Sequence, residues 1–236
     1  MDAWNPWHGC HKYSAGCTNC YVYRRDSSVG KDASIVQKTK SFHDPIRRKR
    51  SGEYVIPNRL LFTCMTSDFF LEDADPWRAE AWDMIRQRPD IRFCIFTKRI
   101  LRAADCFPDD WGDGYPNVII GCTVENQQAA NERLSVFCQL PIAHKWIICA
   151  PLLGPIWLER YLSPQIEELT VGGESGPHAR PCDYDWVLDL RDQCAAQHVP
   201  FQFHATGANF IKNGHRYRIP RRFQKQQAEK AAIDLP

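Results

Sequence analysis

Three cysteines, Cys10, Cys17 and Cys20, lie within one short segment near the N-terminus. Thiolates bind zinc and iron–sulfur clusters, so this grouping indicates a metal site. A structural zinc site needs four ligands, and because the sequence has no second Cys-x-x-Cys, His8 or His11 would have to complete it. A 4Fe-4S cluster held by three cysteines leaves one iron open to a small chelating cofactor. We favour the cluster and keep zinc as an alternative.

The elements that must position this site are short apolar runs, whose continuous hydrophobicity predicts strands buried on both faces. Helical patterns lie between several of them, with Asp75, Asn126 and Asp183 as candidate N-terminal caps. This alternation predicts an α/β protein, either a partial or complete (β/α) barrel of TIM type with six to seven parallel strands or a doubly wound sheet. After a very short first strand at Ala3-Trp4-Asn5, the runs are residues 59–65, 91–97, 117–124, 145–150, 168–173 and 200–204.

Most of these runs end in a cluster of polar residues or glycines. In a barrel, the carboxyl ends of all strands meet at one mouth, where sites are assembled, whereas a doubly wound sheet concentrates its site at one switch point. The clusters therefore favour the barrel. We expect a single domain over residues 1–236, with an N-terminal cluster-binding loop and a basic C-terminal extension at residues 211–236.

Charge is unevenly distributed, although the formal net charge is only +2. Residues 24–50 carry nine Lys or Arg and three Asp, and residues 212–230 carry seven Lys or Arg and one Glu. Two basic segments suggest an anionic partner, with solvated surface segments as the alternative. No secretory pattern and no long apolar run is present, so we expect a cytoplasmic protein without a membrane partner.

The other cysteines are spaced differently from the first three. Cys64, Cys94, Cys122 and Cys149 stand singly inside apolar runs. A chain of this size does not need disulfides to fold, and an unpaired cysteine behaves as a small apolar side chain. We expect these four to be buried in the core.

Several motifs, taken together and in order, resemble a known family. The segment WNPWHGCHKYSAGCTNCY, SDFF at 67–70, FTKR at 96–99, VEN at 124–126, PLLGP at 151–155, GGESG at 172–176 and RP at 180–181 are similar to the three-cysteine-motif, radical-SAM-like proteins frequent in bacteriophage genomes. The resemblance implies that Cys10, Cys17 and Cys20 hold a 4Fe-4S cluster. It also implies reductive cleavage of S-adenosylmethionine, with an external one-electron donor, to a 5′-deoxyadenosyl radical that abstracts hydrogen from a substrate.

The resemblance also assigns cofactor contacts by position at the strand ends. Ser67 and Asp68 would accept from the methionine ammonium group, and Lys98 or Arg99 would meet the carboxylate. Thr123 or Glu125 would hydrogen-bond the ribose hydroxyls. Tyr21, an aromatic residue next to Cys20, would shield the cluster from water.

Two further residues are candidates for proton transfer or substrate binding. Glu174 follows two glycines after a buried strand, where backbone can approach a ligand, and would serve as an acceptor, a substrate clamp or a proton acceptor. His204 ends the last predicted strand and would donate or relay a proton.

The substrate expected from the resemblance and the basic segments is a nucleotide or a modified base in phage DNA. The stretch KNGHRYRIPRRFQKQ at 212–226 interleaves cations with aromatics, as phosphate and base contacts require. The alternative function is a non-catalytic nucleic-acid-binding module stabilised by zinc or by a cluster. A metal-free barrel hydrolase ranks below both.

Overall fold

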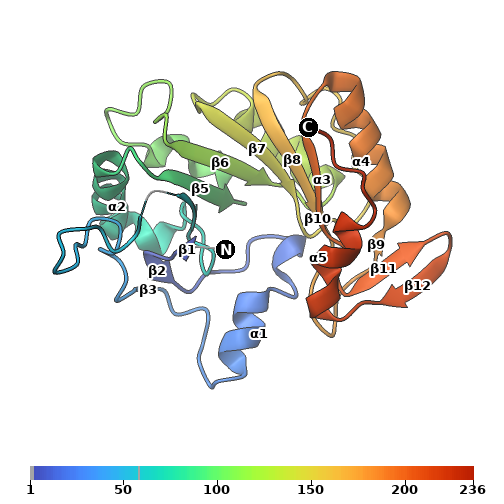
Figure 1. Ribbon diagram of the computed structural model, residues 1–236, viewed down its shortest axis with the longest axis horizontal. Helices are drawn as coiled ribbons and strands as arrows, with labels where there is room; N and C mark the ends of the chain where they lie inside the picture. The colour runs from blue at the N-terminus through green and yellow to red at the C-terminus, as the bar shows by residue number, and fades with distance from the viewer. Residues whose placement is uncertain (1–2, 58) are drawn as a thin grey trace. The chain divides into compact units, whose positions relative to one another are not determined.

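The structure, a computed structural model, describes residues 3–57 and 59–236 and has a mixed α/β fold (Figure 1). Its main sheet has seven strands, and the neighbouring strands β1 and β4, β4 and β5, β7 and β8, and β8 and β10 are parallel. The predicted parallel sheet is therefore confirmed. In spatial order the strands are β1 (Ala3–Trp4), β4 (Leu60–Thr63), β5 (Arg92–Thr97), β6 (Val118–Thr123), β7 (His144–Cys149), β8 (Ile166–Gly172) and β10 (Phe201–Ala205).

The strand order follows the order of the chain without reversal. A doubly wound sheet starts in its middle and reverses, whereas a barrel-type sheet adds each strand beside the previous one. The order is that of a partial (β/α) barrel, and the doubly wound alternative is wrong. The apolar runs and the short first strand expected from the sequence all fall on these strands.

The remaining elements connect or extend this sheet. The helices are α1 (Tyr21–Ser27), α2 (Asp75–Gln87), α3 (Gln127–Phe137), α4 (Tyr184–Gln197) and α5 (Arg221–Glu229). Short 3-10 turns are η1 (Ala15–Cys17), η2 (Glu72–Ala74), η3 (Ile100–Arg102) and η4 (Ala104–Cys106). The other strands are β2 (Trp7–His8), β3 (Gln37–Lys38), β9 (Cys182–Asp183), β11 (Asn209–Lys212) and β12 (His215–Arg218).

The chain divides into two compact units, each assembled from separate stretches of sequence. The first unit contains Met1–Lys12, Val22–Gly121 and Leu140–His144. The second contains Tyr13–Tyr21, Cys122–Gln139 and Lys145–Pro236. The division falls inside the cysteine motif, because Cys10 belongs to the first unit and both Cys17 and Cys20 belong to the second.

An aromatic cluster forms the core of the first unit beside α2. The Phe69 ring meets Trp82 edge to face with ring centroids 4.8 Å apart and lies 5.2 Å from Trp7, and Trp82 in turn lies 5.1 Å from Trp111. Such ring pairs add to the free energy gained by burying their large apolar surfaces. The cluster fixes the chain directly after β4, where the sequence predicts site residues.

Helix α2 begins at Asp75, the residue predicted as its cap, so the cap position lies one residue earlier. Asp75 is the first helical residue and Ala74 takes the cap position, with Pro76 in the first turn. The Asp75 carboxylate instead pairs with Arg78 and with Arg102 at 2.9 Å. The capping prediction was wrong at this residue because two arginines compete for the carboxylate.

In the second unit, both predicted caps are confirmed. The Asn126 side chain accepts from the Ala129 amide at 2.9 Å at the start of α3, and Asp183 accepts from the Asp185 amide at 3.0 Å at the start of α4. A short polar side chain satisfies amides that have no partner within the helix. These caps depend only on local sequence, which is why they could be predicted.

The basic C-terminal segment is folded. Strands β9, β11 and β12 form a small sheet in which β12 is an edge strand, and α5 packs against β10. Figure 1 shows these elements in orange and red, with β11 and β12 as a hairpin. The cations of this segment therefore lie on defined secondary structure.

The cysteines inside the strands are core residues. Cys64, Cys94, Cys122 and Cys149 are buried, as the sequence predicts, and no disulfide forms among the described residues. None of the helices in the described ranges is long and apolar enough to cross a membrane.

Candidate functional site

The segment that carries Cys10 is held through its backbone in the first unit. The Cys10 amide donates to Ala33 at 2.8 Å, the Gly9 amide donates to Thr66 at 3.2 Å, and the Ser67 hydroxyl donates to the Gly9 carbonyl. Gly9 has a φ of +94°, and a Cβ there would lie 2.2 Å from a carbonyl oxygen. Only glycine fits this position.

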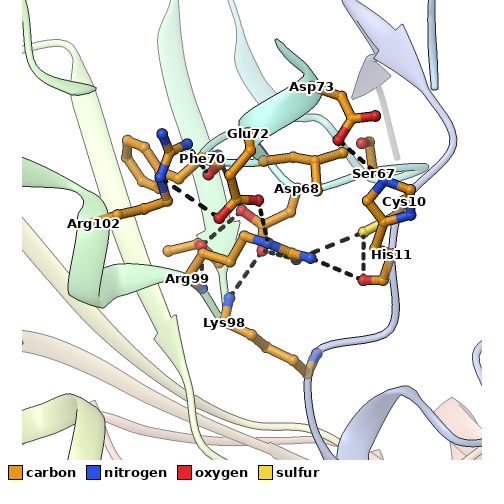
Figure 2. A network of polar contacts seen from close by, with 12 residues as sticks. Cys10, His11, Ser67, Asp68, Phe70, Glu72, Asp73, Lys98, Arg99 and Arg102 are labelled. Carbon is orange, nitrogen blue, oxygen red and sulfur yellow. Dashed lines mark hydrogen bonds and ion pairs between the residues drawn. The ribbon is translucent and has the colours of Figure 1, made fainter. Parts of the chain in front are cut away.

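Arg99 lies directly beside the Cys10 sulfur (Figure 2). Its Nη1 lies 3.7 Å from Cys10 Sγ, and its Nη2 donates to the His11 carbonyl at 2.9 Å. Burial alone would lower the pKa of Arg99, but the charges of Asp68 and of a Cys10 thiolate raise it above its usual value. A buried cation at this distance favours the thiolate form of the cysteine.

Asp68 orders the residues around Arg99. Its carboxylate accepts from the Thr97 hydroxyl at 2.8 Å and from the Lys98 amide at 3.1 Å, and it pairs with Arg99 Nη1 at 3.7 Å. The side chain is 6% exposed. Figure 2 shows the Lys98 side chain directed away from this carboxylate. The structure thus brings together four of the predicted residues of this unit around Cys10: Ser67, Asp68, Lys98 and Arg99.

In the second unit, Glu125 holds the segment Tyr13–Tyr21, which carries Cys17 and Cys20. Its Oε1 accepts from the Gly16 amide at 3.1 Å, and its Oε2 pairs with Arg133 at 2.8 Å. Both side chains are almost fully buried. Burial would raise the pKa of Glu125, but the Ser14 hydroxyl, the Arg133 charge and the bond from Gly16 outweigh it, so the pKa is lowered. Arg133 also donates to the Thr123 carbonyl at 2.6 Å, which places Thr123 beside this pair.

Glu174 holds the same segment from the other end. Asn19, between Cys17 and Cys20, donates to Glu174 Oε2 at 2.9 Å. Arg180 donates to both Glu174 oxygens, at 2.5 and 3.1 Å, and also to the Ala15 carbonyl at 2.9 Å. Burial would raise the pKa of Glu174, but the bonds from Arg180 and Asn19 outweigh it and lower the pKa.

Glu125 and Glu174, which hold residues 13–21 through Gly16 and Asn19, are called the two anchors below. The held segment forms the turn η1. The Cys17 amide donates to the Ser14 carbonyl at 2.9 Å, and the Cys20 amide donates to the Cys17 carbonyl at 3.3 Å. Both thiols are partly exposed. The contacts from Glu125 and Glu174 therefore act on the Gly16 amide and on Asn19, and not on the cysteine side chains.

The three clustered cysteines offer thiol donors, the ligand type that zinc and iron–sulfur clusters use. Cys10, Cys17 and Cys20 are all partly exposed, whereas most of the other cysteines are buried. His8 pairs with Asp26 at 2.6 Å and His11 with Asp73 at 3.0 Å, in both cases through Nε2. Among the residues described, no group of three or more His, Cys, Asp or Glu side chains is placed to hold a metal ion.

Two predicted site residues lie outside these networks. Tyr21 begins α1 with 37% of its side chain exposed. His204 lies in β10, where burial and, second, the charge of Lys225 lower its pKa. It is therefore neutral near neutral pH.

The glycine pair before Glu174 serves a different purpose from the one predicted. A Cβ at Gly173 would lie 2.3 Å from the carbonyl oxygen of Thr206. The glycine lets β8 and the chain after β10 approach each other, with the Gly173 amide donating to Ala205 at 2.9 Å. At Gly173, the backbone of Thr206 and Gly207 occupies the space that a side chain would take.

Sequence reasoning missed the residues that neutralise the carboxylates. Arg133 and Arg180 complete the anchors, and Asn19 connects one of them to the cysteine segment. Nothing in the sequence pointed to Arg133 as a partner of Glu125, because it lies on a helix whose pattern indicated only packing. Arg180 belongs to the RP motif, which carried no assigned role.

Fold and site together define a mixed α/β protein with a sequentially ordered parallel sheet and a cysteine-bearing segment held by two buried carboxylates, each paired with an arginine. The model of the family described as "Protein of unknown function (DUF5131)" matches residues 1–233, and the chain belongs to this family. No curated protein and no solved structure matches the chain.

Proposed function

We propose that the protein is a radical S-adenosylmethionine enzyme in which Cys10, Cys17 and Cys20 would hold a 4Fe-4S cluster. When bound, the cluster supplies the electron that cleaves S-adenosylmethionine to the radical. The observation that carries the proposal is that buried charged side chains fix the backbone on both sides of the thiols. Burying charge costs free energy, so anchors of this kind indicate that the thiols must stand in fixed positions.

In this function, Arg99 would keep Cys10 in the thiolate form needed for a metal ligand. Asp68 would act by fixing Arg99 and the Lys98 backbone, since its oxygens already accept from Thr97 and Lys98. The Lys98 ammonium group, directed away from Asp68, would meet the methionine carboxylate.

Glu125 and Glu174 would be positioning residues. Their lowered pKa values keep both ionised near neutral pH, and their oxygens are engaged by Arg133 and Arg180. Neither is suited to accept a proton from a substrate. His204, neutral near neutral pH, is the better candidate for proton transfer.

The test is anaerobic reconstitution of the full chain with iron and sulfide. We expect brown protein with about four irons that forms 5′-deoxyadenosine from S-adenosylmethionine under dithionite. Cys17→Ala should lose iron and activity together. Cys138→Ala is the matched control, because Cys138 is partly exposed like the three ligands but lies outside the motif.

Three outcomes would contradict the proposal. Colourless protein with one tightly bound zinc would support the non-catalytic module. Equal iron content in Cys17→Ala and in the unchanged protein would exclude the three-cysteine site. A metal-free hydrolytic activity that survives Cys17→Ala would support the hydrolase.

A further inference from the structure

A band of exposed cations runs along β12 and α5 in the second unit. Every residue of β12 is exposed, as is every residue of α5 except Gln224 and Ala228. The band is defined by Arg216 and Arg218 of β12 and by Arg221, Arg222 and Lys225 of α5.

These cations have few acidic partners. Among the described residues of the second unit, one cation of this band forms an ion pair, Lys225 with Glu229 at 3.5 Å. Other exposed cations of the chain are paired, such as Arg86 with Asp83 and Asp110. The positive charge of β12 and of the first turn of α5 is therefore uncompensated.

Stability of the helix does not explain these positions. Arg221 and Arg222 stand in the first turn of α5, which has no acidic residue and no side-chain cap. The helix dipole makes this end positive, so each cation there is unfavourable by about 0.3–1 kcal/mol. A sequence selected for stability would place an acid here.

Two aromatic side chains are exposed among the cations. Tyr217 alternates with Arg216 and Arg218 along the edge strand β12, so its ring lies on the opposite face of the strand from them, and it is 49% exposed. Phe223 follows Arg222 on α5 and is 38% exposed. Exposed aromatic rings on elements rich in cations are what unpaired bases and their phosphates require.

A membrane surface fits this band less well. An interfacial helix needs an apolar face that can enter the lipid. The inner face of α5, with Gln224 and Ala228, already packs against β10, and its exposed face offers one aromatic ring among cations and glutamines. The occupant favoured by the surface is therefore a polyanion with stacking groups.

We infer that β12 and α5 form a docking surface for single-stranded nucleic acid, in which the cations contact phosphates and Tyr217 stacks on a base. The inference rests on the exposed charge and rings of these elements alone. It is independent of whether the chain is an enzyme: both a radical S-adenosylmethionine enzyme and a non-catalytic module would bind single-stranded nucleic acid at this surface.

The experiment measures fluorescence anisotropy of a labelled oligothymidylate of about 12 nucleotides with the full-length protein. Arg218→Ala, Arg221→Ala and Arg222→Ala together should weaken binding at least about tenfold and reduce the salt slope by about 2. The control is Lys31→Ala, Lys40→Ala and Arg50→Ala, which removes the same charge from exposed positions elsewhere. It should leave binding nearly unchanged.

A second pair of variants tests stacking. Tyr217→Ala should weaken binding by about 5- to 100-fold, and Tyr217→Phe, which keeps the ring, should bind like the unchanged protein. Because Tyr217 is exposed, neither change disturbs the core, and circular dichroism checks this.

Several outcomes would overturn the inference: equal weakening by both triple variants, a duplex bound as tightly as the oligothymidylate, or phosphatidylserine vesicles bound while the oligonucleotide is not. All of these measurements use protein without iron. Their failure is therefore distinct from a failure of the proposed enzyme function.

Discussion

The two units hold their cysteines with opposite chemistry. In the first unit, a cation lies at the sulfur itself, since Arg99 approaches Cys10 Sγ at 3.7 Å and donates to the next carbonyl. In the second unit, carboxylates hold the segment, with Glu125 accepting from the Gly16 amide and Glu174 accepting from Asn19. In the first unit a charged side chain contacts both the sulfur and the backbone, whereas in the second unit the charged side chains contact the Gly16 amide, the Ala15 carbonyl and Asn19.

The difference shows what each buried charge is for. A carboxylate near two thiols would oppose their ionisation if it carried an uncompensated charge. In the second unit each carboxylate has its own arginine, at 2.8 Å for Glu125 and 2.5 Å for Glu174. The pairs are close to neutral, so they can fix the backbone without repelling a thiolate.

The largest expected effect comes from Arg133. Arg133→Met leaves Glu125 buried without its ion-pair partner, and we expect unfolding free energy to fall by about 3–5 kcal/mol. Urea unfolding at neutral pH measures this change.

The double variant Glu125→Gln with Arg133→Met removes both charges and is the control. The double variant should lose clearly less unfolding free energy than Arg133→Met alone, because no unpaired charge stays buried. A double variant as unstable as the single one would show that packing around Arg133, and not its charge, stabilises the second unit.

Glu174→Gln tests the other anchor. Arg180 is 31% exposed, so solvent screens this pair and we expect a loss of about 1–2 kcal/mol. Cys17 and Cys20 should react faster with iodoacetamide, as followed at each residue by mass spectrometry, while Cys10 should not change. Glu159→Gln, at an exposed position, is the matched control.

The same variant has a pH signature. The folded pKa of Glu174 lies below its usual value of 4.5, so its stabilisation is complete above that pH and is lost as pH falls through the folded pKa. Glu174→Gln should therefore make unfolding less steeply dependent on acid pH. An unchanged acid limb would contradict an ionised Glu174.

Arg99→Met tests the first unit. Without the cation, the Cys10 thiolate is less favoured, and its alkylation near neutral pH should slow about tenfold. The rate profile should move to higher pH, with Cys17 and Cys20 unaffected. Arg102→Met, which removes a nearby cation that pairs with Asp75 and Glu72, should leave Cys10 unchanged.

The smallest expected effect is at His204. Its lowered pKa means that the unfolded chain takes up a proton near pH 6.5 while the folded chain does not, so stability falls as pH decreases below that value. His204→Gln should reduce this decline between about pH 7 and 5 in thermal unfolding. If His204→Gln shows the same loss of stability between these pH values, a different titratable group causes that loss.

Much of the fold could be predicted because its signals are local. Continuous apolar runs indicated the parallel strands, and Asn126 and Asp183 were identified as caps from the residues that follow them. Asp75 was misjudged because Arg78 and Arg102 reach its carboxylate, and Arg102 is distant in sequence. The site was predicted as a set of residues, while their partners were not.

By itself, the sequence determined which residue types gather at the strand ends, which cysteines stand apart from the core, and where positive charge accumulates. Only the tertiary structure decided that Glu125 and Glu174 face Arg133 and Arg180 and anchor the segment of Cys17. The physical reason is that an ion pair or a side-chain hydrogen bond to backbone depends on atoms meeting across long stretches of chain. Hydrophobic periodicity and capping do not depend on such meetings.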